Sequence, residues 1–315
     1  MNVVCLTNMY PTAAEPGLGV FVKGLVAGLR ALGVDVAVVA FDGRADKRAY
    51  ARAARVLARV VRERDADLVH AHYGLTGVVA LSQRRAPVVT TFHGSEVGYV
   101  RWQALVSWLV ARGCDAPVFV NADAARRLGL PDAPVICAGV DTERFAPVER
   151  TEARRALGWA EDRPYVLFPG ARDSAVKRAD LFDAVVREAR RTRPDLVPVV
   201  LDGHARAEVP VVMNAVDVTL MTSDSEGSPV TIKESLACAT PVVSVPVGDV
   251  PGLLDGLPGC AIAPRDPRAL ADGVLRALAA GREPALRARV EEFSEARVAR
   301  RTLDLYEAVL GGRGA

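Results

Sequence analysis

The chain has 315 residues, which is long enough for two domains of ordinary size, each with its own hydrophobic core. Half of the residues are hydrophobic and a quarter are charged, which excludes a disordered or low-complexity chain. Lys and Arg number 40 against 38 Asp and Glu, so the net charge of +2 gives no reason to expect nucleic acid as a partner. No apolar run approaches the roughly 18–20 residues of a membrane-spanning helix. The first residues, MNVVCL, lack a basic region and predict a strand, not a signal peptide.

The cysteines and lysines carry two further compositional signals. The cysteines never form a C-x-x-C pair, so we expect free, buried thiols in a reducing cytoplasm, with neither a disulfide framework nor a zinc site. They are Cys5, Cys114, Cys137, Cys238 and Cys260. Arginine supplies nearly all of the basic charge, and the only lysines are Lys23, Lys47, Lys177 and Lys233. Each lysine is therefore a candidate for a role that needs a compact ammonium group, with chance as the alternative.

Short apolar strands alternate with helical patterns along the first half of the chain. Strands are predicted at Val3–Leu6, Asp35–Phe41, Asp67–His70, Pro87–Phe92 and Pro117–Val120, with helices at Phe21–Leu32 and Ala45–Arg64. Near-continuous apolar strands separated by helices are typical of a parallel sheet buried on both faces.

The strand–helix rhythm breaks between residues 139 and 163 and then restarts. Further strands are predicted at Tyr165–Phe168, Val197–Leu201, Val216–Met221, Pro241–Val245 and Cys260–Ala263, with helices at Ala179–Arg193, Val230–Cys238 and Ser294–Leu310. We expect an α/β protein of two doubly wound, Rossmann-like domains, 1–149 and 150–295, with a C-terminal helix (296–315) packing back on the first domain. Ligands should bind in a central cleft at the carboxyl ends of both sets of strands.

The most informative segment is EGSPVTIKESLACATPVVSVPVGD, which starts at Glu226 after a predicted strand. Ser228 and Pro229 suit the N-cap and first position of a helix, so the amides of Val230 and Thr231 should point at an anion. Glu234 lies eight residues after Glu226, or roughly 12 Å along a helix. A diphosphate at this helix start would be bracketed by two carboxylates, each able to accept hydrogen bonds from a diol. We therefore expect a nucleotide-sugar site, with Gly227 in its loop; two solvated surface glutamates are the alternative.

This segment resembles the E-x7-E region of the retaining glycosyltransferases of family 4, which have the GT-B architecture. It is most similar to the branch that builds cell-surface polysaccharides and related glycoconjugates. Other segments agree in the expected order over nearly the whole chain: YPTAAEPGLGVFVKGL, DADLVHAHYG, TTFHGSE, GVDTERFAP and LFPGARDSAVKRADL. The E-x7-E block is specific, whereas each of the others is weak alone.

The last of these segments places Arg172 and Lys177 in the first strand-to-helix loop of the second domain. Two cations there suit a diphosphate leaving group, whose charge grows as the glycosidic bond breaks. The resemblance implies this role for both residues, and ordinary solvated basic side chains are the alternative. Where the family usually has glycine after the lysine, this chain has Arg178, which puts the loop geometry in question.

Three features of the first domain are further candidates. Gly17 and Gly19 follow the first strand, where glycine permits close backbone approach; the resemblance implies that the Gly19 amide faces a phosphate or the acceptor, and a structural turn is the alternative. His93 follows a strand, and the resemblance implies that it lies beside the reacting sugar, with a structural histidine as the alternative. Ser95 and Glu96 are then expected to meet the acceptor.

The remaining histidines are less specific. His70 and His72 form H-x-H, but no carboxylate or cysteine stands at ligand spacing, so we expect a structural role and no metal. His204 follows a predicted strand and is expected to approach the nucleotide base or to lie in a plain loop.

Arginines recur at spacings of four and three from Arg48 to Arg62, which predicts one basic stripe along a helix. The stripe comprises Arg48, Arg52, Arg55, Arg59 and Arg62, and the predicted buried face comprises Ala51, Ala54, Ala58 and Val61. A functional interpretation is peripheral contact with the anionic inner face of a membrane, where a lipid-linked acceptor would lie. A solvated helix face is the alternative.

Together these features predict a glycosyltransferase that moves a sugar from a nucleoside-diphosphate sugar to a hydroxyl of a glycan, lipid-linked or small-molecule acceptor. Retention at the anomeric carbon follows from the resemblance alone. The expected catalytic residues are His93, Arg172, Lys177 and Glu226, and no cofactor or divalent metal is expected. The alternatives are a non-catalytic nucleotide-sugar-binding subunit and a GT-B nucleotide-sugar epimerase.

Overall fold

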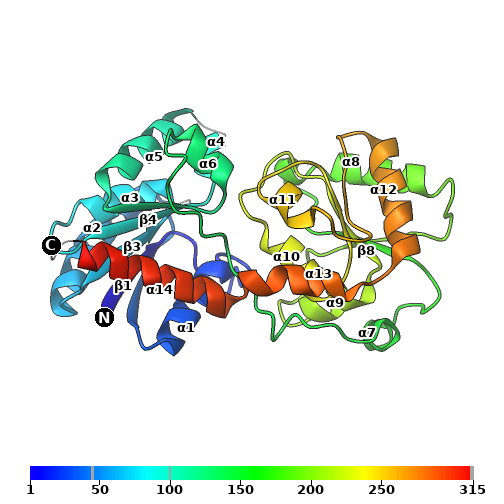
Figure 1. Ribbon diagram of the computed structural model, residues 1–315, viewed down its shortest axis with the longest axis horizontal. Coiled ribbons are helices and arrows are strands. Elements are labelled where there is room, and N and C mark those ends of the chain that lie inside the picture. Colours follow the sequence, from blue (N-terminus) through cyan, green and yellow to red (C-terminus); the bar gives the residue numbers. More distant parts are fainter. Residues whose placement is uncertain (44–45, 99–100, 313–315) are drawn as a thin grey trace. The chain divides into compact units, whose positions relative to one another are not determined.

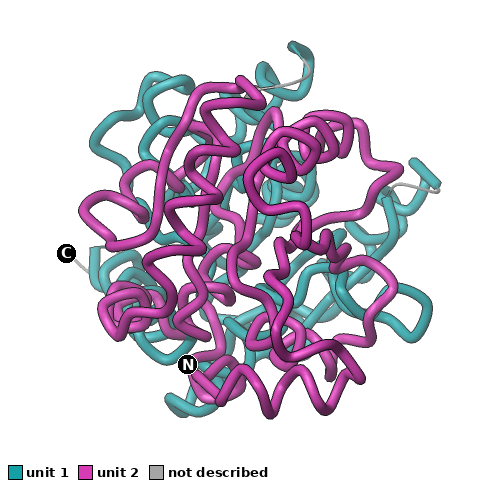
Figure 2. The backbone as a smooth tube through the Cα atoms, turned by 90° about the vertical axis from the view of Figure 1, so that its right-hand side faces the viewer, with its two compact units in different colours: residues 1–139, 295–315 teal, residues 140–294 magenta. Residues whose placement is uncertain are grey.

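A computed structural model describes residues 1–43, 46–98 and 101–312 of the chain. It divides into two compact units, the first formed by residues 1–139 and 295–315 and the second by residues 140–294 (Figure 2). The first boundary therefore lies before residue 140, not at the expected residue 150. The physical reason is that Val140 forms a parallel bridge with Ser294, and Phe145 is buried in the core of the second unit.

The first unit is built on a five-stranded parallel sheet of order β2-β1-β3-β4-β5. Its strands are β1 (Asn2–Thr7), β2 (Asp35–Ala40), β3 (Leu68–His72), β4 (Val88–Phe92) and β5 (Ala116–Phe119). In the central register, Cys5 of β1 lies opposite Val38 of β2 and His70 of β3. These are the five strands that the apolar runs predict.

Helices cover both faces of this sheet (Figure 1). Val3 and Cys5 of β1 pack toward α1 (Val20–Ala31) and α14 (Glu295–Gly311), while Val4 and Leu6 pack toward α2 (Arg48–Glu63) and α3 (Gly74–Leu81). The helices α4 (Ser95–Gly98), α5 (Arg101–Gly113) and α6 (Ala122–Arg127) complete the unit. Strand side chains alternate between the faces, so one apolar run supplies both cores.

Two expected helix ends fall partly outside the described residues. The C-terminal helix belongs to the first unit and begins at Glu295, and its expected last residues, 313–315, lie outside the described part of the chain. The expected start of α2 at Ala45 also lies outside it, and the helix as described begins at Arg48.

The basic stripe of α2 is exposed, and the predicted buried face is right for Val61, half-buried at Ala54 and wrong for Ala51 and Ala58. Every arginine of the stripe is exposed. The buried residues are Ala49, Ala53, Leu57 and Val61, which recur every four residues, whereas Ala51 and Ala58 are exposed. The helix turns Leu57 fully into the core, because a large side chain gains more from burial than an alanine does.

The second unit contains a five-stranded parallel sheet of order β10-β9-β8-β6-β7. Its strands are β6 (Tyr165–Phe168), β7 (Val197–Val200), β8 (Val218–Met221), β9 (Val242–Ser244) and β10 (Ala261–Ile262). One face packs on α8 (Ala179–Ala189) and α12 (Pro267–Ala280). The other packs on α9 (Val209–Ala215), α10 (Val230–Ala237), α11 (Val250–Leu254) and α13 (Pro284–Val290). Because β6 pairs directly with β8, the loops that follow these two strands are neighbours.

All five cysteines fall within the described residues, and none of them forms a disulfide. Within residues 1–43, 46–98 and 101–312, no helix is both long and apolar enough to cross a membrane.

A buried ion pair anchors α7 (Arg150–Leu157), a helix that the sequence pattern did not predict. The carboxylate of Asp217, at the start of β8, accepts hydrogen bonds from Arg154 Nη2 at 2.6 Å and Arg150 Nη1 at 2.5 Å. It also accepts the backbone amide of Tyr165 in β6 at 2.6 Å. One carboxylate thus joins two strands and a helix.

We predict that Asp217→Asn destabilises the second unit by about 3 kcal/mol, because it leaves the buried Arg154 guanidinium without its counter-charge. Urea unfolding followed by circular dichroism measures the effect. As a matched control, Asp195→Asn removes an exposed ion pair with Arg193 and should leave the unfolding midpoint unchanged. Equal midpoints for both variants would contradict the anchoring role.

Candidate active site

The loops after β6 and β8 place a lysine beside a glutamate. Lys177 ends a short 3-10 helix, Ala175–Lys177, and its Nζ donates a hydrogen bond of 2.7 Å to Glu226 Oε1. Backbone contacts hold the two loops together: Thr222 Oγ1 donates to the carbonyl of Lys177 at 2.9 Å, and the Asp224 amide donates to the carbonyl of Val176 at 2.8 Å. Glu226, which is largely buried, is thereby paired with the cation of the neighbouring loop.

Arg172 does not join this pair. Its guanidinium forms an exposed ion pair with Asp183 of α8. An exposed pair of this kind is worth little and can open at low cost.

Arg178 keeps the left-handed turn that a glycine would favour. Its φ is 54° and its ψ is 55°, a conformation that costs a non-glycine residue more than it costs glycine. Two ion pairs hold the Arg178 side chain in this turn, one with Asp180 at 2.8 Å and one with Asp224 at 3.1 Å. Hydrogen bonds to both carboxylates hold the pKa of Arg178 above its ordinary value. Arg178, which stands where the family usually has glycine, therefore adopts the left-handed turn that glycine would favour.

The start of α10 differs from the expected cap. The N-cap residue is Pro229 and the first helical residue is Val230, so the prediction of Ser228 as N-cap is wrong. Ser228 Oγ instead donates to Asp249 Oδ2 at 2.5 Å and accepts a hydrogen bond from Lys233 Nζ. This competing carboxylate draws the serine hydroxyl away from the helix amides.

Lys233 supports the loop that precedes α10 through contacts with Ser228 and Asp249. Its side chain is fully buried, and its ammonium lies 3.5 Å from Asp249 Oδ2 and 5.4 Å from the Phe293 ring centre. Gly248 closes the other side: its φ is +56°, and a Cβ there would lie 2.5 Å from the carbonyl oxygen of Gly227. Both the lysine and the glycine position the backbone around Gly227. The first amides of α10, at Val230 and Thr231, belong to the turn that has no acceptor within its own helix.

Glu234 lies in the second turn of α10 and is buried. It accepts a hydrogen bond from Arg206 Nη2, while its second oxygen has no hydrogen-bond partner among the described residues. Burial raises the pKa of Glu234, and the Arg206 guanidinium opposes that shift. An unpaired, buried carboxylate oxygen is a ready acceptor for a ligand hydroxyl.

Arg206 is a site residue that sequence analysis missed. It follows β7, and its guanidinium lies 5.0 Å from the ring centre of Phe145. Its carbonyl accepts a hydrogen bond from Arg144. The sequence signal that could have identified Arg206 is its position in the loop after β7, two residues beyond His204. His204 itself is half-buried, and its Nδ1 lies 3.7 Å from Glu208 Oε2.

In the first unit, Gly19 is required by packing. It caps α1 with a φ of 64°, and a Cβ would lie 2.3 Å from the carbonyl oxygen of Met9. Gly17 is exposed, with open space around its Cα. The glycine-rich loop thus brings the turn after β1 against the start of α1, which agrees with the structural alternative for Gly19.

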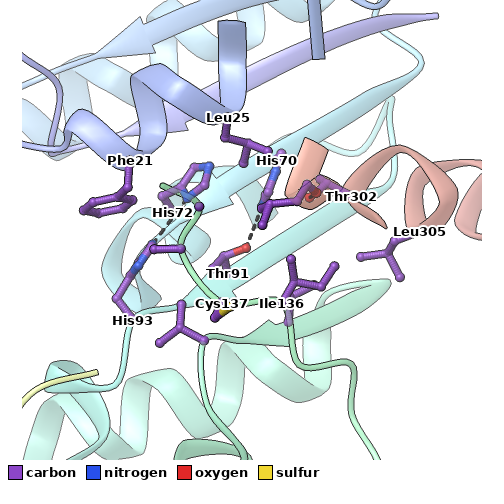
Figure 3. A pocket seen from close by; sticks show the side chains of 15 residues that line it. Phe21, Leu25, His70, His72, Thr91, His93, Ile136, Cys137, Thr302 and Leu305 are labelled. Carbon is purple, nitrogen blue, oxygen red and sulfur yellow. Dashed lines mark hydrogen bonds between the residues drawn. The ribbon is translucent and has the colours of Figure 1, made fainter. Parts of the chain in front are cut away.

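Three histidines line a small pocket between the sheet, α1 and α14 (Figure 3). His70 bridges Tyr306 Oη of α14 at 2.6 Å and Thr91 Oγ1 of β4 at 2.7 Å, so its role is structural. His72 Nδ1 lies 3.3 Å from His93 Nε2, and the two rings stack with centres 5.5 Å apart. Phe21 and Leu25 of α1 cover the histidines from one side.

Burial keeps these rings neutral. It lowers the pKa of His70 to about 3 and the pKa of His93 to about 4, and it lowers the pKa of His72 well below its ordinary value. A neutral imidazole offers one donor and one acceptor nitrogen, which suits a sugar hydroxyl. No group of three or more His, Cys, Asp or Glu side chains within residues 1–43, 46–98 and 101–312 is arranged to hold a metal ion.

Glu96 is buried, and its expected contact with the acceptor remains a prediction. Its Oε1 accepts the His93 amide at 2.8 Å, and burial raises its pKa to about 7. The neighbouring Ser95 is half-buried, with its Oγ 2.5 Å from Tyr73 Oη. Glu96 turns inward, where the His93 amide, just before α4, donates to its carboxylate. It therefore shapes the His93 turn.

Comparison with known proteins assigns both units to glycosyltransferases. A family model described as Glycosyltransferase Family 4 matches residues 17–144, and one described as Glycosyl transferases group 1 matches residues 178–280. Sucrose-phosphate synthase from Thermosynechococcus elongatus superposes with a TM-score of 0.81 at 19% identity, covering 99% of this chain and 100% of that one. Anabaena HepE, solved with UDP and glucose, superposes with a TM-score of 0.74 at 16% identity, covering 98% of this chain and 100% of that one.

Two curated relatives match most of the chain. The putative teichuronic acid biosynthesis glycosyltransferase TuaC of Bacillus subtilis is 25% identical, over 88% of this chain and 89% of its own length. A D-inositol 3-phosphate glycosyltransferase of Geodermatophilus obscurus is 29% identical, over 87% of this chain and 71% of its own length. The two parallel sheets and these similarities define a glycosyltransferase of the GT-B fold. Its first unit matches the family 4 model and its second unit matches the group 1 model, so both units are glycosyltransferase domains.

We predict that stability falls as the pH decreases from 6.5 toward 4 and that His70 contributes to this loss. The folded chain holds His70 neutral down to a pKa of about 3, whereas the unfolded histidine takes up a proton near pH 6.5. His70→Gln should therefore reduce the slope of unfolding free energy against pH by about 1.4 kcal/mol per unit near pH 5. Urea unfolding at several pH values measures the slope.

Thr91→Val is the matched control, because it removes a hydrogen bond of His70 and no titrating group. It should lower stability with the slope preserved. Identical slopes for wild type and His70→Gln would contradict the prediction. Glu96, with its raised pKa, contributes a slope of the opposite sign between pH 4.5 and 7 in all three proteins, so it cancels in the comparison.

Proposed function

We propose that this glycosyltransferase moves a sugar from a nucleoside-diphosphate sugar to an acceptor hydroxyl, with retention at the anomeric carbon and without a metal ion. The second unit would bind the donor, and the first unit would bind the acceptor. The observation that carries the proposal is the pairing of Lys177 with Glu226 beside the start of α10. A cation, a carboxylate and the positive end of a helix lie in one loop cluster, which supports a site for a sugar diphosphate.

The proposed chemistry is a front-face displacement. The bond between the anomeric carbon and the diphosphate oxygen breaks, the acceptor oxygen bonds to the same face of that carbon, and the acceptor proton passes to the departing diphosphate. Negative charge grows on the diphosphate as its bond breaks. Lys177 and the α10 amides would stabilise that charge, and Arg172 would join them once its exposed pair with Asp183 opens. Because these protein groups supply the positive charge, the proposal includes no metal.

The other site residues would position the donor. Glu226 would accept hydrogen bonds from the sugar, and Glu234 would accept them from the ribose through the oxygen that the protein leaves unpaired. Arg206 would keep Glu234 ionised for that purpose. His93 would hydrogen-bond a hydroxyl of the transferred sugar.

The remaining candidate residues would supply further contacts to the donor and the acceptor. Gly227, Ser228, Val230 and Thr231 would form the phosphate-binding backbone, His204 would approach the base, and Gly17 and Gly19 would contact a phosphate or the acceptor. Anabaena HepE was solved with UDP and with UDP-glucose, which supports testing a UDP-sugar first. The name of TuaC supports an acceptor in cell-surface glycan synthesis, whether a glycan, a lipid-linked saccharide or a small molecule. We place the reaction in the cytoplasm, with peripheral membrane contact through the α2 stripe as part of the proposal.

We predict that one nucleotide series raises the melting temperature of the purified chain and that EDTA leaves the shift unchanged. A ligand at a hundred times its dissociation constant adds about 2.7 kcal/mol of stability, which a thermal-shift assay detects readily. The screen uses UDP, GDP, ADP and TDP and their sugars. A shift that EDTA abolishes would contradict metal independence, and no shift with any nucleotide would contradict the donor site.

Lys177→Gln should lower kcat by about 10²–10³-fold, with a smaller change in the KM for the donor, because charge on the leaving group peaks in the transition state. Lys47→Gln is the matched control, since Lys47 lies in the first unit and its ammonium donates a hydrogen bond to the backbone carbonyl of Gly43. Donor turnover followed by nucleotide release measures both variants. NMR of the product reports the anomeric configuration: an inverted product would overturn retention, and unchanged kcat would overturn the role of Lys177.

A further inference from the structure

Helix α5 carries its large apolar side chains on the outside. Trp102, Leu105 and Leu109 are 55%, 59% and 56% exposed, and Trp108 is also exposed. The residues of α5 that are buried are Ser107, Val110 and Ala111. At 100° per residue these two sets fall on opposite sides of the helix. An ordinary surface helix has the reverse arrangement, with its apolar stripe toward the core.

The packing of α5 on α3 fixes this orientation. A Cβ on Gly77 of α3 would lie 2.4 Å from Val110 Cγ1, and a Cβ on Gly74 would lie 2.2 Å from Ser107 Oγ. The two helices therefore approach through glycines and small side chains. That contact leaves no room for a tryptophan or leucine, so the large side chains must face outward.

The surroundings of this apolar face are cationic. Helices α2, α3 and α5 lie next to one another on the same side of the sheet (Figure 1). Between residues 74 and 114 the charged residues are Arg84, Arg85, Arg101, Arg112 and Glu96, and all four arginines are exposed, whereas the glutamate is buried. The Arg112 guanidinium lies 4.1 Å above the Trp108 ring. The exposed arginine stripe of α2 adds positive charge to the same helical layer.

We propose that the α5 face, formed by Trp102, Leu105, Trp108 and Leu109, docks on a lipid bilayer that contains anionic phospholipids. Tryptophan favours the interface between headgroups and acyl chains, and an amphipathic helix can lie in that plane with its apolar side chains inserted. The surrounding arginines then meet anionic headgroups. A second copy of the chain fits less well, because pairing two such faces would bring like charges together. This inference deepens the membrane contact of the proposed function and rests on that part of it, whereas it does not depend on the transfer reaction.

The experiment measures binding of the full chain to vesicles by co-sedimentation. Wild type should bind vesicles of phosphatidylcholine with phosphatidylglycerol, with a blue shift of tryptophan fluorescence, and should bind pure phosphatidylcholine more weakly. The combined variant Trp102→Ser, Leu105→Ser, Leu109→Ser should lose at least about tenfold in partitioning, because three inserted apolar side chains are removed. Arg55→Ser with Arg59→Ser should lose roughly fivefold per arginine on the anionic vesicles alone.

The matched control removes exposed aliphatic side chains elsewhere. Val148 and Ile262 of the second unit are 44% and 38% exposed, and Val148→Ser with Ile262→Ser should leave vesicle binding unchanged. The α5 substitutions lie on the surface, so all variants should keep the wild-type melting temperature.

Three results would overturn the proposal. In the first, wild type stays in the supernatant with every vesicle, and in the second, the combined α5 variant binds as well as wild type. In the third, sedimentation velocity shows a wild-type dimer that the α5 variant converts to a monomer, so that a second copy covers the face. The nucleotide-dependent thermal shift is measured on the same samples, so a failure of membrane docking and a failure of the proposed donor site are distinguishable.

Discussion

The pairing of β6 directly with β8 is the constraint on which the second unit depends. Parallel strands end at one edge of a sheet, so the loops that follow these two strands become neighbours although 49 residues separate Lys177 from Glu226. Thr222 and Asp224 then fix the two loops to each other through their backbones. The lysine–glutamate pair results from this order of strands. The same rule places His72 and His93 together in the first unit, because β3 pairs with β4.

Charge inside this protein is tolerated only where a partner compensates for it. Lys233 is fully buried because Ser228 and Asp249 meet its ammonium and Phe293 lies beneath it. Glu234 is buried beside Arg206, and Asp217 is buried beside Arg154. Where no counter-charge is available, the group becomes easier to neutralise: burial lowers the pKa of the three histidines and raises the pKa of Glu96. The ion pairs bind elements of structure together, while the neutral groups remain available as hydrogen-bond donors and acceptors.

Small residues decide where large ones can go. Gly74 and Gly77 let α3 approach α5 so closely that the tryptophans and leucines of α5 must face outward. Gly19 lets the loop after β1 reach the start of α1, and Gly248 lets the loop after β9 reach Gly227. In each case the missing Cβ sets the distance between two segments of backbone. That distance then determines which side chains become surface and which surround a proposed ligand site.

The sequence by itself determined the order and type of the strands, since apolar runs separated by helical patterns indicate a parallel sheet whatever the details of packing. It also placed Lys177, Glu226 and Glu234 in or beside strand-to-helix turns, because those positions depend on local spacing. Only the tertiary structure decided what each side chain meets. Asp249 takes the hydroxyl of Ser228 from its expected cap, Asp183 holds Arg172, Arg206 reaches Glu234, and Glu96 turns inward. Each partner is distant in sequence or depends on how a turn folds, and hydrogen-bond strength falls steeply with distance and angle. A pattern of residue types fixes which groups are available, but only the packed fold fixes their distances.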